Sequence, residues 1–215
     1  MDTKSNRNQW IKTGAISGLA GGLMYFAAAF IPMPDLAVYV AAFSFGPLLA
    51  IGCTGLYHFL SDADKAPRLQ IALVSAIAGG ITILIMLTVQ QSIFGMMPKA
   101  PENGLSANEA TLLKIRDGLN SVHWGMDVAW DILICTATIL FSWSMIKRTG
   151  LWKLLGGLGI VFGLLLLSFN LYYFPTPPAS VNAIDWGPFV AIWFLIVFVV
   201  LMFKSRSLSK EVTIG

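Results

Sequence analysis

The sequence predicts an all-α, polytopic membrane protein with six transmembrane helices. Of its 215 residues, 56% are hydrophobic and only 12% are charged, about half the charged share of a typical soluble domain. Several runs also approach the roughly 20 apolar residues needed to cross about 30 Å of hydrocarbon. The formal net charge of +3 therefore predicts no nucleic-acid partner, and the lipid bilayer is the expected surrounding.

The expected spans form one domain, residues 1–215. They lie at 11–31, 36–60, 68–96, 121–146, 150–174 and 182–203. The first has a basic start, and "AAA" at Ala27–Ala29 resembles a signal-peptide cleavage site. Its apolar run is longer than a usual signal core, so we expect it to be retained.

Basic residues predict the orientation of these spans. Loops 32–35 and 175–181 contain no Lys or Arg. The bases that flank the other span ends are Lys4, Arg7, Lys12, Lys65, Arg68, Lys147, Arg148, Lys153, Lys204, Arg206 and Lys210. Because cytoplasmic loops are enriched in Lys and Arg, we expect both termini in the cytoplasm.

Residues 97–120 form the longest predicted loop, on the outer side. Its bases Lys99, Lys114 and Arg116 are offset by Glu102, Glu109 and Asp117. "SANE" (Ser106 to Glu109) is a capping-box pattern, followed by Leu112, Leu113, Ile115 and Leu119 at helical spacing. We expect a short amphipathic helix on the outer surface or over the bundle; a plain linker is the alternative.

Three segments suggest an internal repeat. They are "SFGPLLAIG" (Ser44–Gly52), "HWGMDVAWD" (His123–Asp131) and "DWGPFVAIW" (Asp185–Trp193). Each preceding span carries a glycine pair, at Gly21–Gly22, Gly79–Gly80 and Gly156–Gly157, which lets helix backbones approach closely. This predicts three hairpins, 11–60, 68–146 and 150–203, around a pseudo-threefold axis along the membrane normal.

The middle repeat is the unusual one. If the copies are equivalent, the position of Asp127 is Leu48 or Phe189 elsewhere, and that of Asp131 is Gly52 or Trp193. The shared scaffold therefore does not need these carboxylates, which favours a functional role.

Span 121–146 carries a polar stripe along one face. At steps of three or four residues it contains His123, Asp127, Asp131, Cys135, Thr138 and Ser142. An ionisable residue in a membrane span usually faces a cavity or a partner. Gln90 and Gln91, Asn170, Tyr172, Tyr173 and Asp185 lie at the same depth in other spans. We expect an outward-opening polar cavity that tapers inward, with Asp185 alternatively capping the last helix.

Other chemistries find little support. Ser44, His123 and Asp185 lack the GxSxG elbow of a hydrolase, and His58 and His123 lie at opposite ends of their spans, too far apart for one haem. A metal held by His123 and Asp127 is a weak signal, and no cofactor is predicted. Trp124, Trp130 and Trp186 fit either an aromatic cage or an interfacial belt. Cys53 and Cys135 lie in apolar runs and are expected to be buried.

The run from "HWGMDVAWDI" through "SMIKRTGLWKLLGGLGIVFG" resembles a pattern in uncharacterised bacterial multi-span membrane proteins, in which a His/Asp-bearing helix precedes a basic turn and a Gly-rich helix. The resemblance covers two spans. It implies a bacterial inner membrane and no particular activity.

These observations predict a small transporter, or an ion or proton pathway, for a small solute or cation. The expected ligand-binding residues are His123, Asp127, Asp131, Asp185, Asn170 and Gln91, with Asp131 as the proton or cation site. The alternative is a membrane-embedded binding or accessory subunit that moves nothing itself. An intramembrane enzyme lacks a clear nucleophile. Both a homo-oligomer and a membrane partner are compatible with the sequence.

Overall fold

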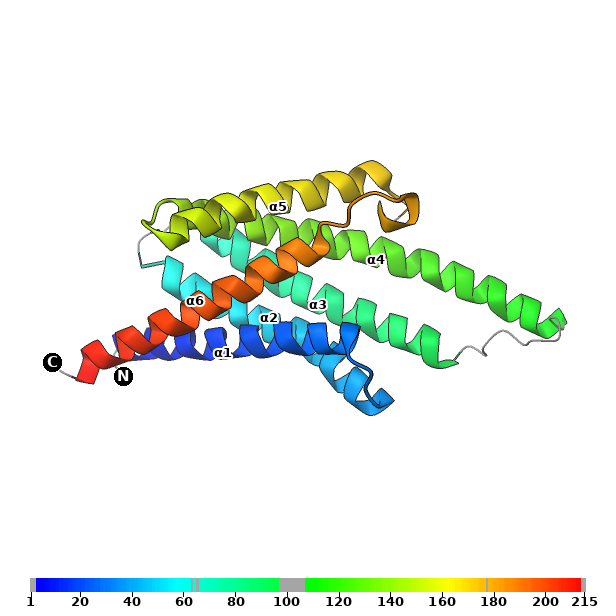
Figure 1. Ribbon diagram of the computed structural model, residues 1–215, viewed down its shortest axis with the longest axis horizontal. Coiled ribbons are helices and arrows are strands. Elements are labelled where there is room, and N and C mark those ends of the chain that lie inside the picture. Colours follow the sequence, from blue (N-terminus) through cyan, green and yellow to red (C-terminus); the bar gives the residue numbers. More distant parts are fainter. Residues whose placement is uncertain (1–2, 63, 65, 97–106, 177, 214–215) are drawn as a thin grey trace.

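The computed structural model describes residues 3–62, 64, 66–96, 107–176 and 178–213. Within these ranges the chain forms six α-helices and one short 3₁₀ helix, η1 (Figure 1). The elements are α1 (Thr3–Phe30), α2 (Asp35–Leu60), α3 (Pro67–Met96), α4 (Ala107–Ile146), α5 (Leu151–Tyr173), η1 (Pro178–Val181) and α6 (Gly187–Thr213). All six α-helices are long and apolar enough to cross a membrane, which confirms the predicted all-α, multi-pass class.

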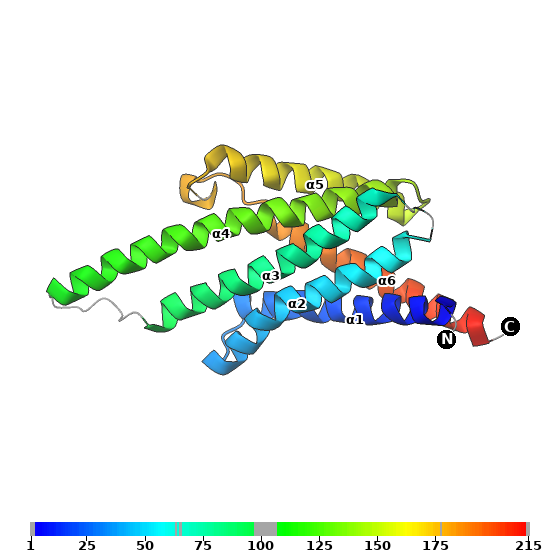
Figure 2. The same cartoon turned by 180° about the vertical axis from the view of Figure 1, so that it is seen from behind.

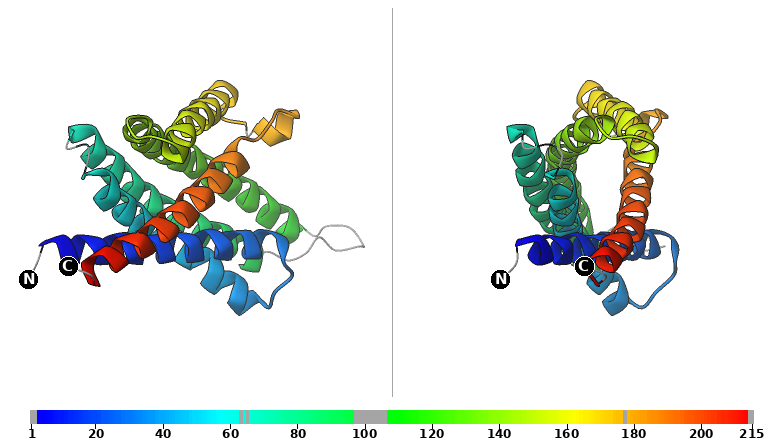
Figure 3. Two further views of the ribbon diagram at one scale, coloured as in Figure 1. Left: turned by 60° about the vertical axis from the view of Figure 1, so that its left-hand side comes forward. Right: turned by 90° about the vertical axis from the view of Figure 1, so that its left-hand side faces the viewer.

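The six α-helices run alternately up and down and form a ring. Each packs against its neighbours in the chain, and α6 returns to pack against α1. The end-on view shows this ring (Figure 3, right). The view from behind shows helices α1, α2, α3 and α4 following one another across one side of the bundle (Figure 2). Both chain termini lie at one end of the bundle, called here the proximal end; the opposite end is the distal end. Among consecutive α-helices, α5 and α6 pack least against each other.

Glycines set the closest helix contacts. A Cβ atom on Gly46 of α2 would lie 2.1 Å from the carbonyl oxygen of Gly80 on α3, and one on Gly55 would lie 2.7 Å from the Cα of Gly14 on α1. Gly80 belongs to a predicted glycine pair, and its role in close backbone approach is confirmed. Gly157, in the third pair, has no neighbour within 4 Å of such a Cβ.

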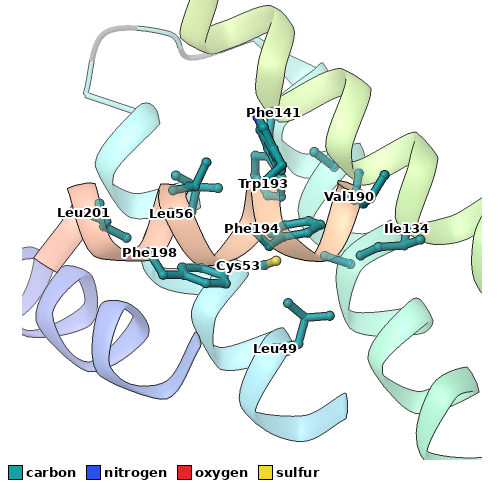
Figure 4. Close-up of a cluster of buried hydrophobic side chains, with 14 of the residues drawn as sticks. Leu49, Cys53, Leu56, Ile134, Phe141, Val190, Trp193, Phe194, Phe198 and Leu201 are labelled. Atoms are coloured by element: carbon teal, nitrogen blue, oxygen red, sulfur yellow. The ribbon is translucent and has the colours of Figure 1, made fainter. Parts of the chain in front are cut away.

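A continuous apolar core runs along the bundle and extends into its proximal half. On α6, the residues Trp193, Phe194 and Phe198 point toward α2 and α4 (Figure 4). Trp193 is only 1% exposed, and its indole N–H donates a hydrogen bond of 2.7 Å to the carbonyl of Leu155 on α5. One side chain thereby joins α6 to α5 through a polar contact and lies within the common core.

A charged cluster closes the proximal end. Asp64, between α2 and α3, is only 8% exposed. It pairs with Arg68, lies 3.5 Å from the ammonium of Lys147 and accepts a hydrogen bond of 3.3 Å from the Ala66 amide. Burial alone would raise the pKa of Asp64, but hydrogen bonds from Arg68, Ser144 and Ala66 and the Arg68 charge outweigh it and lower that pKa.

The structure corrects two helix starts predicted at the distal end, and α1 begins at Thr3, eight residues before its expected start. The expected separate amphipathic helix is wrong: residues 107–120 are the first turns of α4, a continuous helix of 40 residues. At 1.5 Å per residue it is about 60 Å long, and it extends beyond the other helices at the distal end. No proline interrupts this stretch, so the helix need not break. Residues 97–106, including the capping Ser106, lie outside the described residues.

The other corrected boundary is the start of the last span. Helix α6 begins at Gly187, not at residue 182. Pro188 occupies its first turn, where the missing N–H costs nothing. The preceding residues instead form η1 and an irregular segment in which Asn182 has a φ of 56°.

Candidate functional site

A cavity of about 340 Å³ lies inside the helix ring, in its distal half. Such a volume is at the small end of the roughly 300–1,000 Å³ typical of ligand sites. The polar side chains that line it are Tyr25, Asp127, Asp131, Asn170, Ser180 and Asp185. They come from α1, α4, α5 and the segment before α6. Exposed lining residues such as Phe30 and Asp185 mark where the cavity meets the surface.

The three predicted carboxylates do share this cavity, at graded depths. Asp185 is exposed, Asp127 is half-buried and Asp131 is only 6% exposed. Asp127 and Asp131 lie one turn apart on α4, so they project to the same side of that helix. Asp185 also accepts a hydrogen bond of 2.8 Å from the Gly187 amide. It therefore caps the start of α6 and lines the cavity as well.

Asn170 holds the deepest carboxylate. Its side-chain amide donates a hydrogen bond to one carboxylate oxygen of Asp131, and it is itself 8% exposed. No other hydrogen bond to Asp131 arises from the described part of the chain. The second carboxylate oxygen therefore has no hydrogen-bond partner among the described residues.

Aromatic rings form much of the cavity wall. Tyr25 of α1 stacks on Phe45 of α2 with ring centroids 4.5 Å apart, and Phe45 meets the edge of Trp130 at 6.1 Å. Trp124 also lines the cavity. Two of the three tryptophans considered for a cage are therefore at the site, whereas Trp186 packs on Phe162 and Phe189.

Tyr25 is a lining residue that the sequence interpretation missed. The signal was present: Gly18, Gly22, Tyr25 and Ala29 recur at steps of four and three residues and all line the cavity from α1. A single tyrosine in a face of small residues indicates a helix that borders an internal space.

Two predicted site residues lie elsewhere. His123 is buried, but it is not among the lining residues. Its ring instead meets that of Trp124 edge-on at 5.1 Å, and its Nε2 atom has no hydrogen-bond partner in the described chain. Gln91 of α3 does not line the cavity either. Gln91 was placed by its depth, which does not determine the direction in which a helix side chain points. His123 was placed by its four-residue spacing from Asp127, but its ring packs against Trp124 instead.

The polar stripe on α4 does face the bundle interior. Asp131, Cys135, Thr138 and Ser142 are all buried. Toward the proximal end, however, Thr138 donates its hydroxyl to the Ile134 carbonyl at 2.7 Å. Ser142 lies against α5, where a Cβ on Gly159 would come within 2.1 Å of its hydroxyl oxygen. These groups are packed between helices, and the predicted inward taper ends in the apolar core.

The charge of the cavity lining has a single sign. The lining residues contain Asp127, Asp131 and Asp185 but no Lys, Arg or His. Among the described residues, none of these carboxylates takes part in an ion pair. Nor do those residues include a group of three or more His, Cys, Asp or Glu side chains placed to hold a metal ion. Cys53 and Cys135 are buried free thiols, as expected.

Comparisons with known proteins add no family to this geometry: no family model, curated protein or solved structure matches the chain.

Proposed function

We propose that this protein is a small transporter, or an ion or proton pathway, of the bacterial inner membrane that takes its solute from the outer side. The observation that carries the proposal is the convergence of three carboxylates and Asn170 in one cavity inside a membrane-spanning ring. Carboxylates are costly in a bilayer and are kept where they serve a solute or proton path. Basic residues at the proximal end, such as Arg68, Lys147 and Arg148, support cytoplasmic termini and an outward-facing cavity.

The graded depths of the carboxylates support a division of roles. In the proposal, Asp185 attracts the solute at the mouth, Asp127 receives it, and Asp131 is the innermost binding and coupling group. Helix α6 supplies both the mouth and the floor and packs little against α5. It is therefore the helix whose displacement would open the path toward the cytoplasm.

The three-hairpin repeat stays part of this proposal. The helices of the first two expected hairpins pack together, but α2 with α3 and α4 with α5 do so as well, and α5 with α6 packs least. The repeat therefore rests on the sequence pattern alone. Repeat-based transporters commonly work by rocking one repeat against the others around a fixed site.

A second candidate function has its own observation in favour. Toward the proximal end from the cavity, Leu56, Phe141 and Leu201 are almost completely buried, so an apolar core lies between the cavity and that end. A protein that binds a ligand or partner from the outer side and transports nothing would need no further path.

Both candidate functions require that water reaches the carboxylates from the outer side, and cysteine labelling tests this. In a variant lacking Cys53 and Cys135, single cysteines replace Asp127 or Asp131 and are labelled with a membrane-impermeant maleimide from the outer side. Phe141→Cys, below the floor, is the matched control. Fast labelling at 127 and 131 but not at 141 supports the cavity. If a folded protein is labelled at neither aspartate position, both candidate functions are wrong.

Flux then separates the two candidates. In proteoliposomes containing a pH-sensitive dye, with an imposed potassium diffusion potential, a proton pathway acidifies the lumen. Asp131→Asn should abolish that flux, while Asp117→Asn, an exposed carboxylate on the same helix, should preserve it. A cavity that is labelled in a protein without flux favours the binding function.

A further inference from the structure

The cavity has an excess of negative groups that nothing in its lining balances. Asp127, Asp131 and Asp185 meet there, and the lining has no basic side chain. At the proximal end, by contrast, the buried Asp64 is paired with two cations of the same chain. An ionised carboxylate in a site of low dielectric constant needs a counter-charge or a proton. An anionic solute would meet repulsion from all three groups.

The aromatic side chains in the cavity wall favour organic cations over inorganic ones. Tyr25, Phe45, Trp124 and Trp130 line the cavity close to the carboxylates. The faces of aromatic rings attract organic cations, and several rings around one space are the usual means of binding a quaternary or substituted ammonium group. A strongly hydrated inorganic ion gains less from rings and prefers closely grouped oxygen ligands.

The deep end of the cavity is apolar. Its lining there includes Leu49, Ile134, Phe194 and Phe198. Phe198 lies eleven residues beyond Gly187 at the distal start of α6, which is about 16 Å along the helix. Polar groups thus line the mouth and the middle of the cavity, and hydrocarbon lines its floor. A fitting ligand has a charged head toward the mouth and an apolar body toward the floor.

We propose that the cavity binds a lipophilic organic cation, with its ammonium group between Asp127, Asp131 and Asp185 and its apolar body on the floor formed by Phe194 and Phe198. This inference rests on the proposed function and names the chemical class of the solute that the protein would bind. Asn170 orients Asp131 by holding one of its oxygens, so that the other is free for the ammonium group. Proton movement alone would use the carboxylates but not the aromatic wall.

The test uses benzyltrimethylammonium, whose charge is permanent and whose ring fits an apolar floor. Binding to the full-length protein in lipid nanodiscs is measured by calorimetry, with benzyl alcohol, benzoate and Na⁺ as the neutral, anionic and inorganic comparisons. The Asp127→Asn/Asp131→Asn/Asp185→Asn variant supplies the background from partitioning into lipid. We expect saturable binding of the quaternary ammonium to the unmodified protein and none of benzoate.

Two substitutions locate the binding. Asp127→Asn removes a charge that has no partner among the described residues, and it should weaken binding about tenfold or more. Trp130→Leu should weaken binding about threefold or more through loss of a ring face. The matched controls are Asp117→Asn and Trp143→Leu, which lie on the same helix outside the cavity and should leave affinity unchanged.

The outcomes distinguish a failure of this inference from a failure of the proposed function. If cysteines at 127 and 131 are labelled but benzyltrimethylammonium does not bind, the ligand class is wrong and the cavity stands. Equal displacement by Na⁺, or unchanged affinity in Asp127→Asn and Trp130→Leu, also overturns it. If neither position is labelled, the proposed function is wrong, and the ligand inference falls with it.

Discussion

The two halves of this bundle treat the same residue type in opposite ways. Asp64, at the proximal end, is buried and has Arg68 and Lys147 beside it. Asp131, in the distal half, is just as buried but has one neutral partner, Asn170. Asp131 also lines a cavity of about 340 Å³, whereas Asp64 does not.

Under the proposed function, this difference separates a carboxylate that stabilises the fold from one that binds a ligand. Breaking a buried ion pair is costly because the remaining charge stays buried without a partner. Asp64 should therefore contribute to stability through its own chain. The distal carboxylates have no such partner to lose, so they should contribute little to the free energy of folding. Substitutions in each half can break or sharpen this contrast.

The largest effect is expected in the proximal core. Trp193→Ala removes a side chain that is 1% exposed together with its hydrogen bond to Leu155. Loss of packing should lower the free energy of unfolding by about 3 kcal/mol, the lower end of the range for buried aromatic residues, because lipid supplies no hydrophobic transfer term. Thermal unfolding in detergent measures the change. The control is Trp143→Ala on α4, 56% exposed, which should cost less than about 1 kcal/mol; equal losses would contradict a packed proximal core.

Composition and apolar run length were sufficient to predict the all-α, six-helix class, because a bilayer leaves few alternatives to helices. The boundaries at residues 107 and 187 were not predictable in the same way. The beginning of α4 carries no breaker that would separate it from the span, and Pro188 starts a helix instead of marking a loop.

The site was only partly predictable for a related reason. Asp127, Asp131 and Asn170 were found because polar residues in apolar spans are conspicuous. His123 and Gln91 were misplaced, and Tyr25 was missed. Which face of a helix borders the cavity depends on how the ring of helices closes, and closure between α6 and α1 involves contacts distant in sequence.

The proximal ion pair should give the next largest effect. Asp64→Asn removes the charge that Arg68 and Lys147 face. We expect a loss of roughly 1.5–3 kcal/mol in the free energy of unfolding, the usual worth of hydrogen bonds to charged groups. Asp62→Asn is the control: Asp62 pairs with Arg7 but is largely exposed, so its loss should fall below about 1 kcal/mol. A larger loss from Asp62→Asn would reverse the assignment.

The same pair predicts a pH dependence of stability. Because the folded state lowers the pKa of Asp64 below its ordinary value of 3.8, its contribution is fully present well above that value. It is lost as the pH falls through the lower, folded pKa. The difference in melting temperature between the unmodified protein and Asp64→Asn should therefore be constant from about pH 8 to 5 and shrink below about pH 4. A difference that grows on acidification would contradict the sign.

The smallest effect on stability is expected at the carboxylates of the membrane-spanning part of α4, Asp127 and Asp131. Asp127→Asn and Asp131→Asn should change the free energy of unfolding by less than about 1 kcal/mol, or raise it, because no cation of the chain loses a partner and the cost of an isolated charge disappears. In Asp131→Asn, the new side-chain carbonyl still accepts the hydrogen bond from Asn170, so the change isolates the charge. Thermal unfolding without added ligand measures both variants. A loss of 2 kcal/mol or more would mean that these carboxylates hold the bundle together as Asp64 does. A small change combined with lost flux or cation binding would show that the carboxylate is needed for the ligand and not for the fold.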